Sequence, residues 1–161
     1  MKTLFLLRHA KSSQKGVSDF ERPLNVRGIA AAKLIGEVIQ KRKLTFDLVL
    51  SSPAVRARET TQLVLAAAKI QPVIRFDQRI YEAGPSRLLQ VVSEIEPDVD
   101  TAVVVGHNPG LSELLQLLTG ETQHMSTANL AKIDLENPDW GTTKLGGGTL
   151  DWILRPKELG D

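Results

Sequence analysis

The chain has 161 residues, which is enough for one ordinary domain and too short for two well-buried ones. Lys and Arg number 20 against 19 Asp and Glu, so the net charge of +1 gives no global field for nucleic acid or an anionic membrane. The absence of cysteine excludes disulfides and thiolate metal sites. We therefore expect a single domain over residues 1–161, in which any anion binding is local.

The N-terminal apolar stretch is short. It runs from Leu4 to Leu7 and is interrupted by Arg8, which is too soon for the core of a signal peptide or a membrane-spanning helix. The interior apolar stretches do not reach the length of a bilayer either. These features predict a cytoplasmic protein.

The first half of the chain alternates between short apolar runs and segments of helical period. Residues 2–7 predict a strand, and the polar, glycine-containing segment 12–24 predicts a loop over its end. Asn25 can cap a helix whose apolar residues recur every three or four positions and which ends in basic residues 41–43.

A second unit of the same kind follows. Residues 46–50 predict a buried strand, after which Ser52 can cap a helix and Pro53 can occupy its first turn. That helix is expected to end at Ala68.

The second half begins in the same way and then changes character. Further strands and helices are expected at 73–76, 86–94, 101–105 and 109–118. Residues 128–135 and 149–154 alternate weakly, with a glycine-rich turn at 146–148, and predict edge strands in antiparallel pairing. The whole pattern is typical of an α/β fold with a mainly parallel sheet.

Candidate phosphate ligands follow three of these strands. Arg8 and His9 end the first, Arg56 lies just inside the helix after the second, and His107 follows the strand at 101–105. Parallel strands bring their carboxyl ends to one edge of the sheet, so these residues can converge. Arginine forks bind phosphate oxygens, and a neutral histidine can attack phosphorus or move a proton.

Each of these residues also has an ordinary explanation. An Arg–His pair can decorate a surface loop, Arg56 can extend along an amphipathic helix, and His107 can belong to a capping turn. Their order at three strand ends makes the combination improbable by chance. The spacing of the three histidines (His9, His107 and His124) matches no zinc motif, and no glycine-rich nucleotide loop follows the first strand.

The motifs resemble those of a known family. Residues 7–10 (Leu-Arg-His-Ala) resemble an Arg-His-Gly signature with alanine in place of glycine, residues 52–60 resemble an S-x-x-x-R-A-x-x-T element, and residues 106–107 resemble a second-histidine motif. In this the chain is similar to the histidine phosphatase superfamily, which includes phosphoglycerate mutases. The short length and the segments 21–24, 106–110 and 155–157 look most similar to the small phosphohistidine phosphatase branch. The resemblance implies a phosphoglycerate mutase-like, three-layer α/β/α sandwich.

The resemblance also implies a mechanism. His9 would attack phosphorus and form a covalent phosphohistidine, with a backbone carbonyl fixing the tautomer of its ring. Arg8, Arg56 and a protonated His107 would surround the phosphoryl oxygens, so neither a metal nor another cofactor is expected. Glu82 lies where mutase-like relatives place a proton donor, although a solvated carboxylate explains it equally well.

The remaining expectations concern the substrate. The candidate substrate-binding residues are Lys11, Ser12, Arg22 and Asn108. The favoured function is dephosphorylation of phosphohistidine in a partner protein, such as a phosphotransfer domain, by a monomer. The alternatives are a phosphatase for small phosphomonoesters and a non-catalytic phosphate-binding module.

Overall fold

A mixed sheet forms the middle of the computed structural model, which describes residues 1–14 and 17–159. Within these residues the six strands lie in the order β3-β2-β4-β1-β5-β6. Their bounds are β1 (Lys2–Arg8), β2 (Leu48–Ser51), β3 (Val73–Phe76), β4 (Thr101–Gly106), β5 (Leu130–Leu135) and β6 (Gly148–Leu154). The first four are parallel, whereas β5 pairs antiparallel with both β1 and β6. The prediction of a mainly parallel sheet is confirmed.

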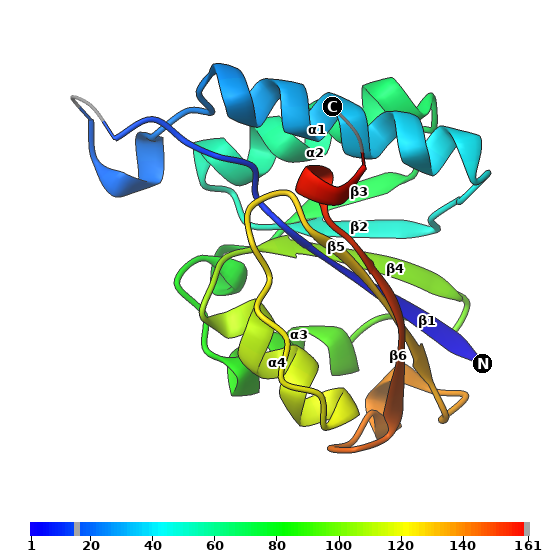
Figure 1. Ribbon diagram of the computed structural model, residues 1–161. Coiled ribbons are helices and arrows are strands. Elements are labelled where there is room, and N and C mark those ends of the chain that lie inside the picture. Colours follow the sequence, from blue (N-terminus) through cyan, green and yellow to red (C-terminus); the bar gives the residue numbers. More distant parts are fainter. Residues whose placement is uncertain (15–16, 160–161) are drawn as a thin grey trace.

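Helices cover both faces of this sheet, as Figure 1 shows. The pair α1 (Val26–Lys41) and α2 (Val55–Ala68) lies on one face, and the pair α3 (Pro85–Ser93) and α4 (Gly110–Thr119) lies on the other. Short 3-10 turns occur at Asp19–Glu21 (η1), Gln78–Ile80 (η2), Trp140–Thr142 (η3) and Pro156–Glu158 (η4). The expected three-layer α/β/α sandwich is confirmed.

The central strand β1 shows why both faces need a helical layer. Its Leu4 and Leu6 pack in the apolar cluster on the α3–α4 side, and its Phe5 and Leu7 pack in the cluster on the α1–α2 side. Successive strand residues point to opposite faces, so a strand covered on both faces is continuously apolar. Arg8, the last residue of β1, is half-buried and lies where the strand leaves this core.

The N-terminus of α1 has the predicted cap. The side-chain oxygen of Asn25 accepts a hydrogen bond from the backbone N–H of Gly28 at 2.9 Å. A Cβ atom at Gly28 would lie 2.0 Å from the carbonyl oxygen of Lys11. Glycine at this position thus lets the segment that follows β1 pack directly on the start of the helix.

Two predictions about these elements were wrong, one on where a helix begins and one on where a strand lies in the sheet. Helix α2 begins at Val55 with Ala54 as its N-cap, so Ser52 and Pro53 belong to the connection after β2 rather than to the helix. The hydroxyl of Ser52 is instead bound by a histidine of another loop, described below. Strand β5 is also not at an edge, because β6 pairs with its outer side.

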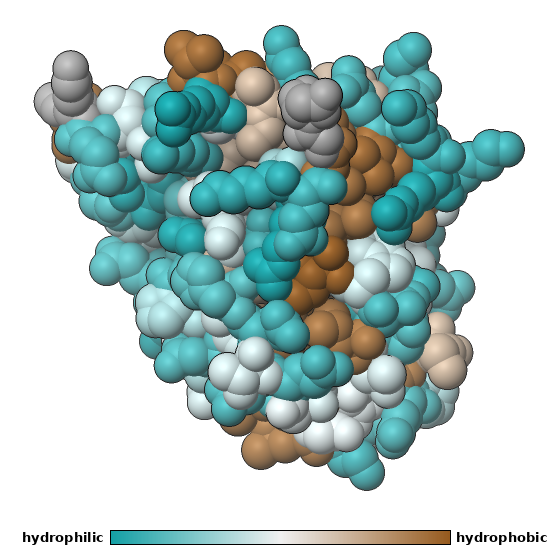
Figure 2. Space-filling view, viewed as in Figure 1, coloured by the Kyte–Doolittle hydropathy of each residue, from teal (hydrophilic) through white to brown (hydrophobic). Residues whose placement is uncertain are grey.

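The face of the molecule drawn in Figure 2 is mostly hydrophilic. Apolar side chains gather along the middle of this face, between α1 and the β5–β6 end of the sheet. Trp152 and Ile153 of β6 are half-buried. Among the described residues, no helix is both long enough and apolar enough to cross a bilayer.

Candidate active site

Three strands end at the same level of the sheet. In the parallel register Arg8 lies opposite Gly106, and Ser51 lies opposite Val105. The backbone N–H of His9 donates to the carbonyl of Gly106 at 3.0 Å. The residues that follow the three strands (His9, Ser52 and His107) therefore emerge side by side at the carboxyl edge, where open α/β sheets bind ligands.

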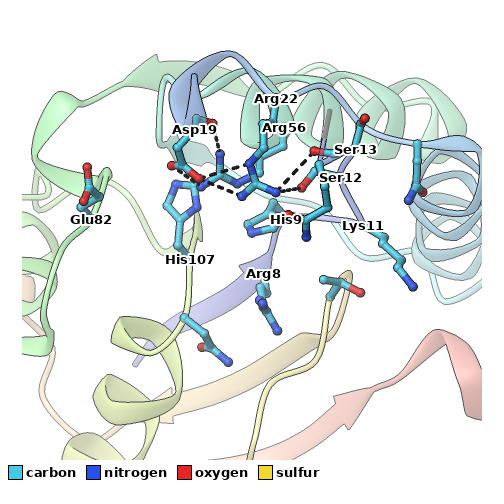
Figure 3. Close-up of a pocket in the computed structure, with 14 residues that line it drawn as sticks. Arg8, His9, Lys11, Ser12, Ser13, Asp19, Arg22, Arg56, Glu82 and His107 are labelled. Carbon is cyan, nitrogen blue, oxygen red and sulfur yellow. Dashed lines mark hydrogen bonds and ion pairs between the residues drawn. The ribbon is translucent and has the colours of Figure 1, made fainter. Parts of the chain in front are cut away.

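A pocket of about 800 Å³ opens above this edge. Figure 3 shows the side chains that surround it, drawn from the strand ends, the loop before α1, the start of α2 and the loop before α3. All nine residues expected to form the site line it: Arg8, His9, Lys11, Ser12, Arg22, Arg56, Glu82, His107 and Asn108. The structure thus brings together residues that are up to 100 positions apart in the sequence.

His9 has its ring orientation fixed by the backbone. Its Nδ1 lies 2.7 Å from the carbonyl oxygen of Ala10. Because a carbonyl can only accept, Nδ1 carries the hydrogen and Nε2 keeps its lone pair. Burial, together with the nearby Arg56, lowers the pKa of His9 to about 4, against the hydrogen bond to Ala10, which raises it. His9 is therefore a neutral base near pH 7.

The loop that carries His9 is anchored to α2. The backbone N–H of Ala10 donates to the hydroxyl of Thr60 at 2.9 Å, and the same hydroxyl donates to the carbonyl of Arg56 at 2.7 Å. Thr60 is fully buried. One hydroxyl thus connects the loop of His9 to the helical turn that carries Arg56.

His107 lies next to His9, with ring centroids 5.1 Å apart. Its Nε2 lies 2.8 Å from the hydroxyl oxygen of Ser52, while its buried Nδ1 has no hydrogen-bond partner among the described residues. Burial, followed by the charges of His9 and Arg56, lowers the pKa of His107 to about 3. The sequence led us to expect a protonated His107, whereas these surroundings favour the neutral ring.

Two arginines bring positive charge into the pocket. Arg56 is 5% exposed, and Arg8 donates to the carbonyl of Met125 at 3.1 Å. Burial and the proximity of Arg56 lower the pKa of Arg8. The Nε atoms of both arginines are buried without a hydrogen-bond partner in the part of the chain that the structure describes. Unused buried donors on two adjacent guanidinium groups favour an anion as ligand.

Asp19 is a member of the site that the sequence reasoning missed. It lies on η1, and its carboxylate accepts from Arg22 at 2.8 and 3.2 Å, from Arg56 at 3.1 Å and from the hydroxyl of Tyr81 at 2.5 Å. The hydrogen bond from Tyr81, helped by those from Arg22 and Arg56, holds the pKa of Asp19 far below its ordinary range. Its position three residues before Arg22 was a signal that an ion pair could form.

The expected substrate-binding residues differ in how they are held. The Nη1 of Arg22 donates to the hydroxyl of Ser12 at 3.0 Å, and Lys11 is exposed. Asn108 binds its own surroundings, because its amide donates to the carbonyl of Met125 at 2.6 Å and its oxygen accepts from the backbone N–H of Ser112 at 3.1 Å. All four residues line the pocket, but the side-chain hydrogen bonds of Asn108 go to Met125 and to Ser112 of α4.

Glu82 lines the same pocket from its outer side. It is exposed, and its backbone φ of 55° is in the left-handed region. In Figure 3 it stands beyond His107, on the side away from His9. Its carboxylate is therefore a member of the pocket wall rather than of the cluster at the strand ends.

Comparison with known proteins identifies the family. The sequence model of the histidine phosphatase superfamily (branch 1) matches residues 4–84, which is half of the chain. The chain belongs to the histidine phosphatase superfamily. The matched segment carries the Arg8–His9 motif and Arg56, and the prediction of this family from those motifs is confirmed.

Relatives extend this similarity over the rest of the chain. An uncharacterized protein of Mycobacterium tuberculosis is 38% identical over 113 residues, which cover 70% of this chain and 69% of that protein. The phosphohistidine phosphatase SixA of Escherichia coli is 25% identical over 160 residues, covering 97% and 95% of the two chains. The solved structure of a protein of Nakamurella multipartitia, to which SixA-type phosphohistidine phosphatase activity is ascribed, has a TM-score of 0.85 at 27% identity and covers 96% of each chain. These similarities support the small SixA-like branch of the superfamily.

Ser52 has a different role in the structure from the one predicted. Its position between a predicted strand and a predicted helix led us to expect a helix cap, and it is also the first residue of the S-x-x-x-R-A-x-x-T element. In the structure its hydroxyl forms a hydrogen bond with the ring of His107, 55 positions away.

Within residues 1–14 and 17–159, the structure contains no group of three His, Asp or Glu side chains placed to hold a metal ion.

Proposed function

We propose that this chain is a metal-independent phosphatase that forms a covalent phosphohistidine on His9 and dephosphorylates phosphohistidine in a partner protein. The observation that carries the proposal is the hydrogen bond from Nδ1 of His9 to Ala10, which leaves a neutral Nε2 in the same pocket as the guanidinium groups of Arg8 and the buried Arg56. An unprotonated nitrogen next to fixed cations suits attack on a phosphoryl group.

In the first step, Nε2 of His9 forms a bond to phosphorus while the bond from phosphorus to the leaving group breaks. The electron pair of the broken bond leaves with that group. The guanidinium groups of Arg8 and Arg56, which line the pocket, bind the equatorial oxygens, where charge collects in a loose transition state. A bound phosphoryl dianion also raises the pKa of His107, so that its ring can donate to the same oxygens.

In the second step, water attacks the phosphorus of the phosphohistidine, and the electron pair of the P–N bond returns to Nε2. Glu82 is the candidate base for that water. The hydrogen bond between Nδ1 and Ala10 persists through both steps, because Nδ1 keeps its hydrogen throughout. No metal ion takes part in either step of this proposal.

The choice of substrate rests on the leaving group. When the ring of a phosphohistidine is protonated, imidazole leaves from phosphorus as a neutral group without further acid help, whereas an alkoxide needs a proton donor. Glu82 lies on the outer wall of the pocket, beyond His107, and the departure of a protonated phosphohistidine ring does not depend on a proton from it. The name of the relative from Escherichia coli supports the same substrate class. A small phosphomonoester is the second candidate, because a carboxylate does line the pocket.

The test is the variant His9→Ala, assayed with a phosphohistidine-bearing phosphotransfer domain and with an aryl phosphate. We expect turnover to fall by at least about a thousandfold, as for other covalent nucleophiles. An acid-labile phosphoryl label should be trapped on the wild-type protein and not on the variant. Full wild-type activity in excess chelator is also expected.

The matched control is His124→Ala, which removes an exposed histidine outside the pocket lining and should leave turnover unchanged. Undiminished hydrolysis by His9→Ala would refute the nucleophile, and sensitivity to chelator would refute the metal-independent mechanism. That the protein is a cytoplasmic monomer stays a prediction.

A further inference from the structure

The carboxylate of Asp19 is a fixed negative charge in the pocket, paired with the cations Arg22 and Arg56. Its side chain is 52% exposed, whereas that of Arg56, to which it is paired, is 6% exposed. Asp19 therefore stands on the solvent side of Arg56, and it lines the same pocket as His9. A phosphoryl group bound at the strand ends would have its leaving group directed outward, toward the side of the pocket on which Asp19 lies.

Three donors hold this carboxylate in place from three segments of the chain. Arg22 belongs to the same loop, Arg56 to α2, and Tyr81 to the loop before α3. The backbone carbonyl of Asp19 also accepts from Nη1 of Arg56 at 2.6 Å. The position and the ionised state of Asp19 are thus set by the fold and do not depend on a substrate.

Tyr81 is not available as an acid for the leaving group. Its hydroxyl donates to Asp19 at 2.5 Å, and this hydrogen bond raises the pKa of Tyr81 to about 12. On this side of the pocket, Asp19 therefore presents a charge and not a proton. A fixed charge acts on any charge that the leaving group carries in the transition state.

We propose that Asp19 is a specificity-determining residue that favours leaving groups carrying positive charge, such as the protonated imidazole of phosphohistidine, over leaving groups that become negative. The inference rests on the proposed function, because it requires phosphoryl transfer to His9.

The charges in the two reactions differ in sign. In protonated phosphohistidine the ring nitrogen that is not bonded to phosphorus carries a proton, and the ring is cationic. When the P–N bond breaks, its electron pair goes to the ring nitrogen and neutral imidazole departs, so part of the positive charge persists in the transition state. When the P–O bond of an aryl ester breaks, the electron pair goes to oxygen and negative charge develops there. The carboxylate of Asp19 attracts the positive charge on the imidazole ring and repels the negative charge on the aryl oxygen.

The experiment compares N-phosphoimidazole with phenyl phosphate, two substrates of similar size whose leaving groups differ in charge. The measured quantity is the ratio of their kcat/KM values. For Asp19→Asn, which keeps the size of the side chain and an oxygen that can accept hydrogen bonds, we expect this ratio to fall about tenfold, which corresponds to about 1.4 kcal/mol. Asp19→Ser, a second variant without the charge, should shift the ratio in the same direction.

Two controls keep a structural effect apart from an effect of charge. Asp19→Glu retains the negative charge and should keep the ratio within about twofold of wild type. Asp139→Asn removes one charge from the exposed turn before η3 and should leave both substrates unaffected.

The outcomes are distinguishable. If both charge-free variants lose activity equally on the two substrates, Asp19 merely supports the arginines and the inference is overturned, while the proposed function stands. If the wild-type protein hydrolyses neither of the two substrates and also fails to hydrolyse a phosphohistidine-bearing phosphotransfer domain, the proposed function fails and the inference fails with it.

Discussion

The edge of the sheet and the loop wall above it build the same pocket by different means. At the edge, His9 and His107 are placed by the hydrogen-bonded register of β1 and β4, and Arg56 by the buried turn that Thr60 anchors. On the wall, Asp19 and Arg22 are placed by side-chain contacts between loops. Backbone register leaves little freedom, whereas a contact between two side chains depends on those two residues and changes with a single substitution. The edge suits the reaction itself, and the wall suits the choice of substrate.

The largest effect among the following variants should come from Arg56→Ala, which removes a buried cation from the edge. We expect kcat/KM to fall by about a hundredfold to a thousandfold, because a preorganised donor to the phosphoryl oxygens is lost. Steady-state kinetics with an aryl phosphate measures the loss. Arg58→Ala, an exposed residue on the same helix, is the matched control and should stay near wild type. Comparable activity of the two variants would contradict the assignment of Arg56.

The next effect is a loss of stability in acid. His9 has a pKa of about 4 in the folded protein, against 6.5 for an unperturbed side chain. The unfolded chain therefore binds this proton first, and the free energy of unfolding falls as the pH decreases from 6.5 to 4, by up to about 3 kcal/mol. His107 acts in the same direction, and Asp19, whose pKa is lowered, adds a further loss below about pH 4.

Urea unfolding of the wild type and of His9→Asn at pH 7, 5.5 and 4.5 measures this dependence. The variant lacks the titrating ring, so its free energy of unfolding should decrease less between pH 6.5 and 4. Identical pH dependence of the two proteins would show that His9 is not held neutral by burial.

The smallest effect should come from the wall. Glu82→Gln keeps the shape of an exposed side chain, and we expect kcat/KM for phosphohistidine to fall by less than about threefold. For a phosphomonoester the fall should be larger, because an alkoxide needs a proton donor. A loss as large as that of Arg56→Ala, with both substrates, would remove the distinction between edge and wall.

Much of the edge was predictable because its signals are local. The apolar run of β1 ends in Arg8 and His9, and the run of β4 ends at His107, so the rule that parallel strands share a carboxyl edge was enough to bring them together. The family motifs pointed to the same residues. The cap at Asn25 was predictable too, since a helix start depends on its nearest neighbours in sequence.

The wall was less predictable because its contacts are not local. Asp19 and Tyr81 are 62 positions apart, and no periodicity relates a 3-10 turn to a loop that the fold happens to place beside it. Ser52 was mistaken for a helix cap for the same reason, because its partner His107 is 55 positions away. The protonation state of His107 also escaped sequence reasoning, since it depends on how deeply the ring is buried and on which cations surround it.

The sequence by itself determined the α/β class, the family and nine of the residues that line the pocket, because strand patterns, helix caps and strand-end motifs depend on neighbouring positions. The tertiary structure decided which nitrogen of His9 is free, that His107 is neutral, and that Asp19 faces the pocket as a fixed charge. Tautomers, pKa values and ion pairs depend on burial and on distances between remote segments, and those distances exist only once the chain has folded.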